Sequence, residues 1–390
     1  MVDYDSVILK SVLQTKPSGI RKFFDLLSNM ENVVGLTVGQ PDFVTPWHIR
    51  EAGIESLENG KTYYTSNAGI PELRNEISNY LYRKFHVLYR PETEIIVTVG
   101  GSEAIDLAFR TLIGPGDEVI LPLPAFVCYE PLIKLAGGVP VIIETTFIEK
   151  FKLNPEKLKA AITPRTKMLV LPYPNNPTGA IMTKEELSEI ADIIRDTNII
   201  VLSDEIYSEM TYDRVHTSFA SLPGMYEHTI LVNGFSKTYA MTGWRLGYLC
   251  APEILCLQIL KLHQYVIMCA PTTSQYAACE ALKNGDDDVA MMIDEYNHRR
   301  RYIYNSLKNI GLDSLEPEGA FYIYPNISEY GLTSEEFCEK LLFNYNCAIV
   351  PGTAFGDCGE GFVRISYAYS IKHITIALER IEAFLKDLKK

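Results

Sequence analysis

Short apolar runs alternate with helical patterns along the first three quarters of the chain, and this alternation limits the possible folds most. The runs are rich in Val, Ile and Leu and end in turn signals: EIIVTVG (94–100), KMLVLPYP (167–174), NIIVLSDEIY (198–207) and TILVNGF (229–235). Strands that are apolar throughout are buried on both faces, which is typical of parallel sheets lying between helices. The sequence therefore predicts an α/β fold with a mostly parallel sheet flanked by helices in a large domain.

The pattern of apolar and charged residues changes after residue 285. A long charged helical pattern spans residues 290–309, and short strand-like segments and further helical patterns follow it. A chain of 390 residues is long enough for more than one core. We expect an N-terminal segment (1–45) packing with the small domain, a large domain (46–285) and a smaller α+β domain (286–390).

Composition narrows the classes of partner. The chain has 36 basic and 49 acidic residues, a formal net charge of −13, which opposes nonspecific nucleic-acid binding. The eight cysteines form no C-x-x-C pair and the histidines show no metal spacing, so we expect free thiols and no metal site. The most apolar long stretch, residues 254–270, contains Lys261 and His263 and is not expected to cross a membrane. A cytoplasmic protein is expected.

Two residues at neighbouring strand ends carry the strongest chemical signal. Lys237 lies just past the strand 230–232, and Asp204 ends the strand before it. In open α/β sheets, ligands bind beyond the carboxyl ends of the strands. A solvated Lys and a helix-capping Asp are the ordinary alternatives, but Arg245 and partial burial would favour a neutral Lys237 amine. A reactive amine facing a carboxylate suits pyridoxal 5′-phosphate (PLP), whose pyridine nitrogen is kept protonated by such a carboxylate.

Other strand ends add candidate groups. Tyr207 is placed to hydrogen-bond the phenolic oxygen of such a cofactor. Gly101 and Ser102 join a strand to a helix and predict an anion cradle, although Ser102 as a plain N-cap is the competing interpretation. Asn176 follows a third strand, and we predict a cis Asn176–Pro177 bond. Arg364 lies in an apolar strand and needs either a structural salt bridge or a substrate carboxylate.

Together these segments resemble the class I and II aminotransferases of PLP fold type I. The resemblance runs nearly end to end, through GQPDF from Gly39, YTSNAGIPELR from Tyr64, NPTG from Asn176, DEIY from Asp204 and SK at Lys237. Within that family the chain is similar to bacterial N-acetyl-L,L-diaminopimelate aminotransferases, at segments such as SGIRKF and LSDEIYSEMTYDR. It is also similar to archaeal aromatic aminotransferases, notably at PAFVCYEP.

The resemblance implies a role for each residue around the cofactor ring. Lys237 forms the Schiff base with PLP and moves the substrate proton. Asp204 pairs with the pyridine nitrogen, and Phe126 stacks on the ring. Asn176 and Tyr207 hydrogen-bond the 3-oxygen. A second cis bond is implied at Leu123–Pro124.

The resemblance also implies how the phosphate and the substrate are bound. The phosphate is assigned to Gly101, Ser102 and Arg245. Tyr64 reaches the phosphate of the other subunit's cofactor in a homodimer whose active sites lie at the interface. The substrate α-carboxylate is assigned to Arg364, Asn176 and the backbone of Gly39. One departure is Gly234, where many relatives have a phosphate-binding Ser. The sequence does not show that Ser236, next to Lys237, replaces it, so one phosphate hydrogen bond is unaccounted for.

The implied reaction is a ping-pong transfer of an α-amino group from an L-amino acid to a 2-oxo acid such as 2-oxoglutarate. N-acetyl-L,L-diaminopimelate ranks first as substrate, aromatic amino acids second and aspartate third. Arg21, Lys22 and the stretch 263–269 are candidates for the distal pocket, while a solvated helix start is the alternative for Arg21 and Lys22. Four aromatic residues are candidates for a pocket wall, with core packing as the favoured interpretation for the last two: Tyr64, Phe126, Tyr129 and Tyr265.

Two other functional classes fit parts of the pattern. A PLP-dependent C–S β-lyase would use the same lysine and ring contacts but eliminate a thiol. A non-catalytic regulator with an aminotransferase-like domain would need an additional DNA-binding module, and Lys237 and Asp204 disfavour it.

Overall fold

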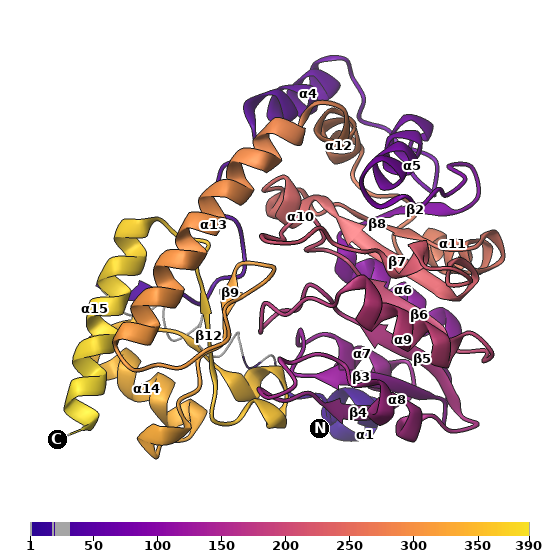
Figure 1. Cartoon of the computed structure of the whole chain (residues 1–390). Helices are drawn as coiled ribbons and strands as arrows, with labels where there is room; N and C mark the ends of the chain where they lie inside the picture. Colours follow the sequence, from indigo (N-terminus) through magenta and orange to yellow (C-terminus); the bar gives the residue numbers. More distant parts are fainter. Residues whose placement is uncertain (1, 18, 20–31, 390) are drawn as a thin grey trace.

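The computed structural model describes residues 2–17, 19 and 32–389, and a seven-stranded sheet organises most of them (Figure 1). Strand β8 is antiparallel to both of its neighbours, and all other pairs in the sheet are parallel. The mostly parallel α/β sheet is therefore confirmed. In spatial order the strands are β2 (Ile95–Thr98), β8 (Gly247–Cys250), β7 (Thr229–Gly234), β6 (Ile200–Asp204), β5 (Thr166–Leu171), β3 (Glu118–Leu123) and β4 (Val139–Glu144).

Helices cover both faces of this sheet, which explains why its central strands are apolar throughout. Successive side chains point to opposite faces. Val119 and Leu121 of β3 pack in one core cluster, whereas Ile120 between them packs in another. The first cluster contains side chains of α6 (Gly101–Leu112), α7 (Tyr129–Leu135) and α11 (Glu253–Val266). The second contains side chains of α8 (Pro155–Ala161) and α9 (Lys184–Ile194).

The C-terminal elements form a separate layer beside the sheet, with α13, α14 and α15 on its outer side (Figure 1). A three-stranded antiparallel sheet has the order β11-β12-β9, and β1 pairs in parallel with β10. The N-terminal strand thus joins the C-terminal elements. The elements are β1 (Val34–Gly35), α13 (Asp286–Asn309), β9 (Tyr322–Ile323), α14 (Ser334–Tyr345), β10 (Cys347–Ala348), β11 (Val350–Pro351), β12 (Val363–Ser366) and α15 (Ile371–Leu388).

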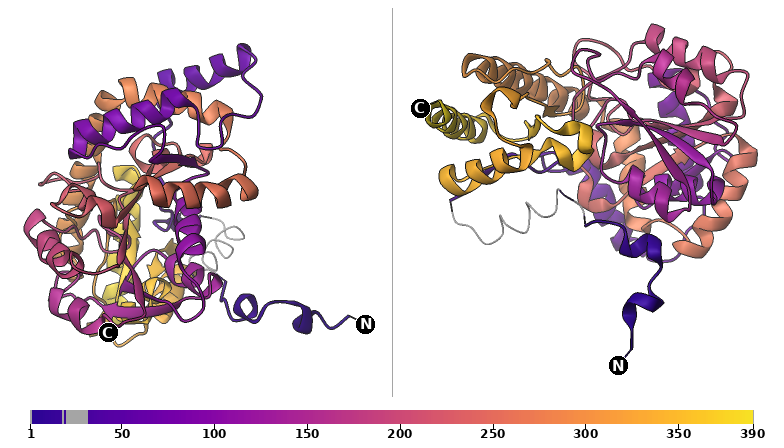
Figure 2. Two further views of the ribbon diagram at one scale, coloured as in Figure 1. Left: turned by 90° about the vertical axis from the view of Figure 1, so that its right-hand side faces the viewer. Right: turned by 90° about the horizontal axis from the view of Figure 1, so that it is seen from below.

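Most of the remaining helices lie at the periphery. Near the N-terminus the chain runs away from the rest of the molecule as an arm carrying α1 (Figure 2). The division of the chain into an N-terminal segment and two domains, with bounds at residues 45 and 285, remains a proposal. None of the helices that the structure describes has the length and apolarity needed to span a membrane. The peripheral helices are α1 (Tyr4–Val7), α2 (Lys10–Leu13), α4 (Trp47–Glu58), α5 (Pro71–Phe85) and α12 (Thr272–Asn284). The short α10 (Phe235–Thr238) is mostly buried and follows β7 directly.

Two cis peptide bonds are present, at Leu123–Pro124 and Tyr173–Pro174. The first was expected. The prediction for Asn176–Pro177 was wrong, because the cis bond of that segment lies three residues earlier. The turn around Asn176 is held instead by the side chain of Asn175, whose Oδ1 accepts hydrogen bonds from the backbone N–H and the hydroxyl of Thr178.

Candidate active site

The carboxyl ends of five strands meet along one edge of the large sheet. Strands β3, β5, β6 and β7 are mutually parallel, and β2 runs in the same direction because both it and β7 are antiparallel to β8. A cavity of about 390 Å³ opens at this edge. Every residue predicted to bind the cofactor or the substrate α-carboxylate, except Tyr64, lines it: Gly39, Gly101, Ser102, Phe126, Asn176, Asp204, Tyr207, Lys237, Arg245 and Arg364.

Lys237 lies in the short helix α10, directly after β7. Its Nζ donates a hydrogen bond to the carbonyl oxygen of Gly39, 2.6 Å away. Burial, and then the positive charges of Arg364 and Arg245, lower the pKa of Lys237 to about 8. The amine can therefore lose its proton near neutral pH, as a nucleophile that attacks a carbonyl must.

Asp204 is the last residue of β6 and is buried. Its Oδ2 accepts a hydrogen bond from the Tyr129 hydroxyl at 2.6 Å, and its Oδ1 accepts one from the Ile206 backbone N–H at 3.1 Å. Burial raises the pKa of Asp204. No helix begins here, so the alternative of a helix cap was wrong. Within residues 32–389 no basic side chain forms an ion pair with Asp204, so this buried carboxyl suits a protonated pyridine nitrogen.

Arg364 is buried in β12 between two aromatic rings. Its Cζ lies 4.5 Å from the ring centroid of Tyr322 and 4.8 Å from that of Phe355. Its Nη1 donates to Asn176 Oδ1 at 3.0 Å and its Nη2 to the Thr37 carbonyl at 2.6 Å.

The guanidinium of Arg364 has no acidic partner within the part of the chain that the structure describes, and its Nε has no hydrogen-bond partner there. The alternative of a structural salt bridge therefore finds no support among the described residues. Burial lowers the pKa of Arg364. A buried cation of this kind suits an anionic ligand, and its fork matches a carboxylate.

A candidate phosphate cradle lies at the start of α6. The helix begins at Gly101, and its N-cap is Gly100 with φ +77°, so the interpretation of Ser102 as the N-cap was wrong. A Cβ on Gly100 would lie 2.9 Å from Arg245 Nη2, which shows how closely that guanidinium approaches the helix start. Free N–H groups, a hydroxyl and a guanidinium together suit a phosphate group.

Glu103 is the acidic residue in the first turn of α6, and its carboxylate is held by two contacts within the protein. Glu103 Oε1 lies 2.7 Å from His263 Nδ1, and Oε2 accepts a hydrogen bond from the Val99 backbone N–H. Each oxygen of the Glu103 carboxylate therefore has a hydrogen-bond partner within the protein.

The departure at Gly234 has a steric cause. A Cβ on Gly234 would lie 2.9 Å from Gly247 Cα and 3.1 Å from the Leu246 carbonyl oxygen, because β7 and β8 pair there. A serine at this position cannot fit without moving the strands. Ser236 lines the cavity and is the hydroxyl that this chain offers instead.

Several expectations about the pocket wall are changed by the structure. Tyr64 is 78 % exposed and lies outside the cavity lining, and Tyr265 is 87 % exposed, so the expectation of core packing for Tyr265 was wrong. Tyr129 is buried as expected, but it also hydrogen-bonds Asp204. Arg21 and Lys22 lie outside the described residues.

One lining residue was missed by the sequence argument. Tyr322 lies in the segment GAFYIYP, which was assigned only to a strand, and its hydroxyl is 2.8 Å from that of Tyr207. An aromatic run in a short apolar strand looks like core. Only the tertiary fold brings the hydroxyl of Tyr322 to the end of a strand in another part of the chain.

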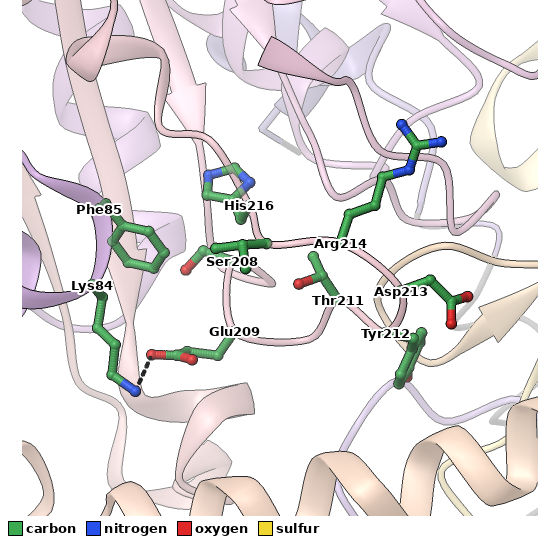
Figure 3. A pocket seen from close by; sticks show the side chains of 10 residues that line it. Lys84, Phe85, Ser208, Glu209, Thr211, Tyr212, Asp213, Arg214 and His216 are labelled. Atoms are coloured by element: carbon green, nitrogen blue, oxygen red, sulfur yellow. Dashed lines mark ion pairs between the residues drawn. The ribbon is translucent and has the colours of Figure 1, made fainter.

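A second cavity of about 390 Å³ lies next to the loop that follows Tyr207 (Figure 3). It shares no lining residue with the first cavity. Among its charged lining residues, Lys84 and Glu209 form an ion pair, with 3.4 Å between Lys84 Nζ and Glu209 Oε1. Among the described residues no group of three or more His, Cys, Asp or Glu side chains is arranged to hold a metal ion, and all eight cysteines are free.

Comparisons with known proteins agree with this site. Residues 31–381 match the family model for aminotransferase class I and II. A Bacillus subtilis protein named "Putative aminotransferase YugH" is 52 % identical over 374 residues, covering 96 % of this chain and 97 % of that protein. Another from the same organism, named "Probable N-acetyl-LL-diaminopimelate aminotransferase", is 48 % identical over 96 % of this chain and 94 % of its own length.

A solved structure extends the likeness to three dimensions. The aromatic aminotransferase from Pyrococcus horikoshii OT3 superposes with a TM-score of 0.90 at 43 % identity, covering 95 % of this chain and 99 % of that one. The fold and the matched family define a PLP-dependent enzyme of fold type I. More narrowly, the chain belongs to the class I and II aminotransferases.

Proposed function

We propose that this aminotransferase moves the α-amino group of an L-amino acid to a 2-oxo acid such as 2-oxoglutarate in a ping-pong reaction, with N-acetyl-L,L-diaminopimelate as the favoured substrate. One observation carries the assignment of the site. A lysine with a lowered pKa, a buried carboxyl and a buried arginine that has no acidic partner among the described residues line a single cavity: Lys237, Asp204 and Arg364.

The groups of this cavity fit PLP. Asp204 would hold the pyridine nitrogen, and Phe126 would stack on the ring. Tyr207 and Asn176 would hydrogen-bond the 3-oxygen. The phosphate would lie among Gly101, Ser102, Arg245 and, in place of the missing side chain at Gly234, Ser236. When bound, PLP takes up the amino group and spreads the negative charge left when the α-proton departs.

The protein's own residues would bind the substrate and move its proton. Arg364 and Asn176 would orient the α-carboxylate, with the Gly39 backbone beside them. Lys237 Nζ, with its pKa near 8, would accept the proton from the substrate α-carbon and deliver it to the carbon of the cofactor that is bonded to the transferred nitrogen. Proton transfer by a positioned base contributes about 10²–10⁴-fold to such rates.

The choice of substrate is supported by the relatives rather than by the cavity. The relative at 48 % identity is named as a probable N-acetyl-LL-diaminopimelate aminotransferase, and the structural neighbour at 43 % identity is named as an aromatic aminotransferase. Aromatic amino acids are therefore the second candidate and aspartate the third. Cytoplasmic location stays a prediction.

A homodimer is part of the proposal. The exposed large apolar side chains include several on the N-terminal arm and on the surface around Tyr64: Val2, Tyr4, Val7, Leu9, Tyr63, Tyr64, Tyr265 and Met268. Apolar side chains gathered in this way are typical of a surface that another chain covers. Tyr64 would then reach the cofactor phosphate of the other subunit.

A panel of half-reactions tests the proposed function. The purified PLP-loaded enzyme is mixed with one amino donor at a time, and the absorbance is followed for conversion of the cofactor to its amino form. We expect fastest conversion with N-acetyl-L,L-diaminopimelate, ahead of phenylalanine, tyrosine and aspartate. Faster conversion with an aromatic donor or aspartate would overturn the substrate assignment. Pyruvate and ammonia from cystathionine, without conversion by any donor, would identify a C–S β-lyase.

A further inference from the structure

Tyr322 connects two groups of the site that lie in different parts of the chain. It is a buried residue of β9, where it pairs with Ser366 of β12, the strand that carries Arg364. Its hydroxyl oxygen lies 2.8 Å from that of Tyr207, which follows β6 of the large sheet. Among the described residues, the two hydroxyls have no hydrogen-bond partner other than each other.

The surroundings fix the position of this hydroxyl. A Cβ built on Gly39 would lie 2.3 Å from the Tyr322 oxygen, so the hydroxyl occupies space that only a glycine leaves free. The Tyr322 ring lies under the guanidinium of Arg364, with 4.5 Å between Cζ and the ring centroid. One side chain thus contacts Arg364 with its ring and Tyr207 with its hydroxyl.

Hydrogen-bond chemistry sets the direction of the contact. A phenol has one proton to donate. If Tyr207 donates that proton to the 3-oxygen of the cofactor, its own oxygen can only accept, and Tyr322 must be the donor. Hydrogen bonds in such a chain polarise and strengthen one another. A Tyr207 hydroxyl that accepts from Tyr322 is therefore a better donor to a negatively charged oxygen.

We propose that Tyr322 is a positioning residue whose hydroxyl orients and polarises the Tyr207 hydroxyl toward the 3-oxygen of PLP. The inference rests on the proposed role of Tyr207. This hydrogen bond joins Tyr207, which follows a strand of the large sheet, to Tyr322 of the C-terminal elements. Its loss weakens the stabilisation of the 3-oxygen anion and so raises the pH at which the bound cofactor changes its absorbance.

The test compares absorbance-versus-pH titrations of the PLP-loaded wild type, Tyr322→Phe and Tyr324→Phe. Tyr324 is the matched control, because it is a buried tyrosine two residues along the same segment whose hydroxyl donates to the Gly352 carbonyl at 3.3 Å. For Tyr322→Phe we expect the midpoint to rise by roughly 0.4 to 1 pH unit, equivalent to one neutral hydrogen bond. Tyr324→Phe should leave it unchanged.

A double variant separates this inference from the proposed role of Tyr207. Tyr207→Phe should raise the midpoint, and adding Tyr322→Phe to it should have no further effect. If Tyr207→Phe leaves the midpoint unchanged, the proposed role of Tyr207 fails. If Tyr207→Phe raises it and Tyr322→Phe does not, the inference about Tyr322 is wrong. Equal shifts in Tyr322→Phe and Tyr324→Phe would also overturn it.

A second variant covers the case in which Tyr322→Phe does not fold. Replacing Tyr322 with 3-fluorotyrosine adds one fluorine and makes the hydroxyl a stronger donor. The inference predicts a lower midpoint for this protein than for the wild type. A midpoint that is the same or higher would contradict it.

Discussion

The charges of single residues determine most of the chemistry that this site can perform. Burial acts on Lys237 and Asp204 in opposite directions, lowering the pKa of the amine and raising that of the carboxyl. Each group is thereby moved toward its neutral form. Both pKa shifts reflect the free-energy cost of burying a charge. A cationic ring nitrogen beside Asp204 and an imine bond at Lys237 would both relieve that cost, so one PLP molecule would satisfy both groups.

The first prediction concerns the stability of the protein freed of cofactor. Because the pKa of Lys237 is lowered from 10.5 to about 8, the unfolded chain binds more protons between these values and stability rises with pH there. Below pH 8 the buried charge costs on the order of 1–3 kcal/mol. Lys237→Met should therefore show its largest gain in unfolding free energy below pH 8, and the gain should shrink toward pH 10.5.

Denaturant titrations at several pH values measure this gain. Lys134→Met is the control, because Lys134 is exposed and pairs with Glu130 one helical turn away. Its effect should not vary with pH in the same window. A Lys237→Met difference that stays constant from pH 7 to 10.5 would show that the amine is not destabilised by burial.

The second prediction concerns Arg364. Arg364→Lys keeps the charge but removes the fork that matches a carboxylate, so kcat/KM for an α-amino acid should fall about 10- to 150-fold, the loss of one charge-assisted hydrogen bond. The slow reaction of an amine that lacks the carboxylate serves as the comparison and should change little. Equal losses for both substrates would mean that Arg364 does not bind the carboxylate.

At the scale of elements, the strand ends explain which parts of the site the sequence could predict. Asp204, Lys237 and Asn176 each follow an apolar run, so the carboxyl-edge rule places them together without knowledge of the fold. Tyr322 and Tyr129 belong to segments that look like core, and their hydroxyls find Tyr207 and Asp204 only through tertiary packing. Local pattern predicts elements and their ends, whereas contacts between distant elements need the fold.

Two details of the backbone conformation also could not be predicted from the local sequence pattern. The sequence predicted a cis bond within the Asn176 turn, but the structure places it at Tyr173–Pro174. Gly100 and not Ser102 caps α6. Both differences involve the choice between residues two or three positions apart in the same turn, which composition alone does not determine.

The third prediction concerns the pairing of β7 with β8. Gly234→Ser, which introduces the serine of many relatives, should destabilise the protein by about 1–3 kcal/mol because the side chain meets the backbone of β8. It should not tighten PLP binding. Thermal unfolding and PLP titration measure both effects.

Gly243→Ser is the control for this substitution, since a Cβ there meets no atom within 4 Å. It should leave the thermal midpoint nearly unchanged. A Gly234→Ser protein as stable as the wild type and with tighter PLP binding would contradict the steric explanation.

At the scale of the whole molecule, the site is assembled from both parts of the chain. The large sheet contributes Lys237 and Asp204, and the C-terminal elements contribute Arg364 and Tyr322. Gly39 joins them from the segment that follows β1. The substrate carboxylate would thus lie between the two parts, and its binding would hold them together.

The fourth prediction tests whether the site also needs a second copy of the chain. Lys237→Ala and Tyr64→Ala proteins should each be strongly impaired. After mixing and subunit exchange, mixed dimers would contain one site with both residues intact, so activity should return to about a quarter of the wild-type value, given half mixed dimers with one good site each. Sedimentation verifies the dimer. No recovery after proven exchange would mean that Tyr64 does not serve the other subunit's site.

The most direct test of the account is chemical identification of the lysine that binds PLP. Borohydride reduction of the loaded enzyme fixes the cofactor to that lysine, and digestion with mass spectrometry locates the pyridoxyl group. We expect a single modified peptide with the group on Lys237. Modification of a different lysine, or none at all, would contradict the assignment of this cavity as the active site.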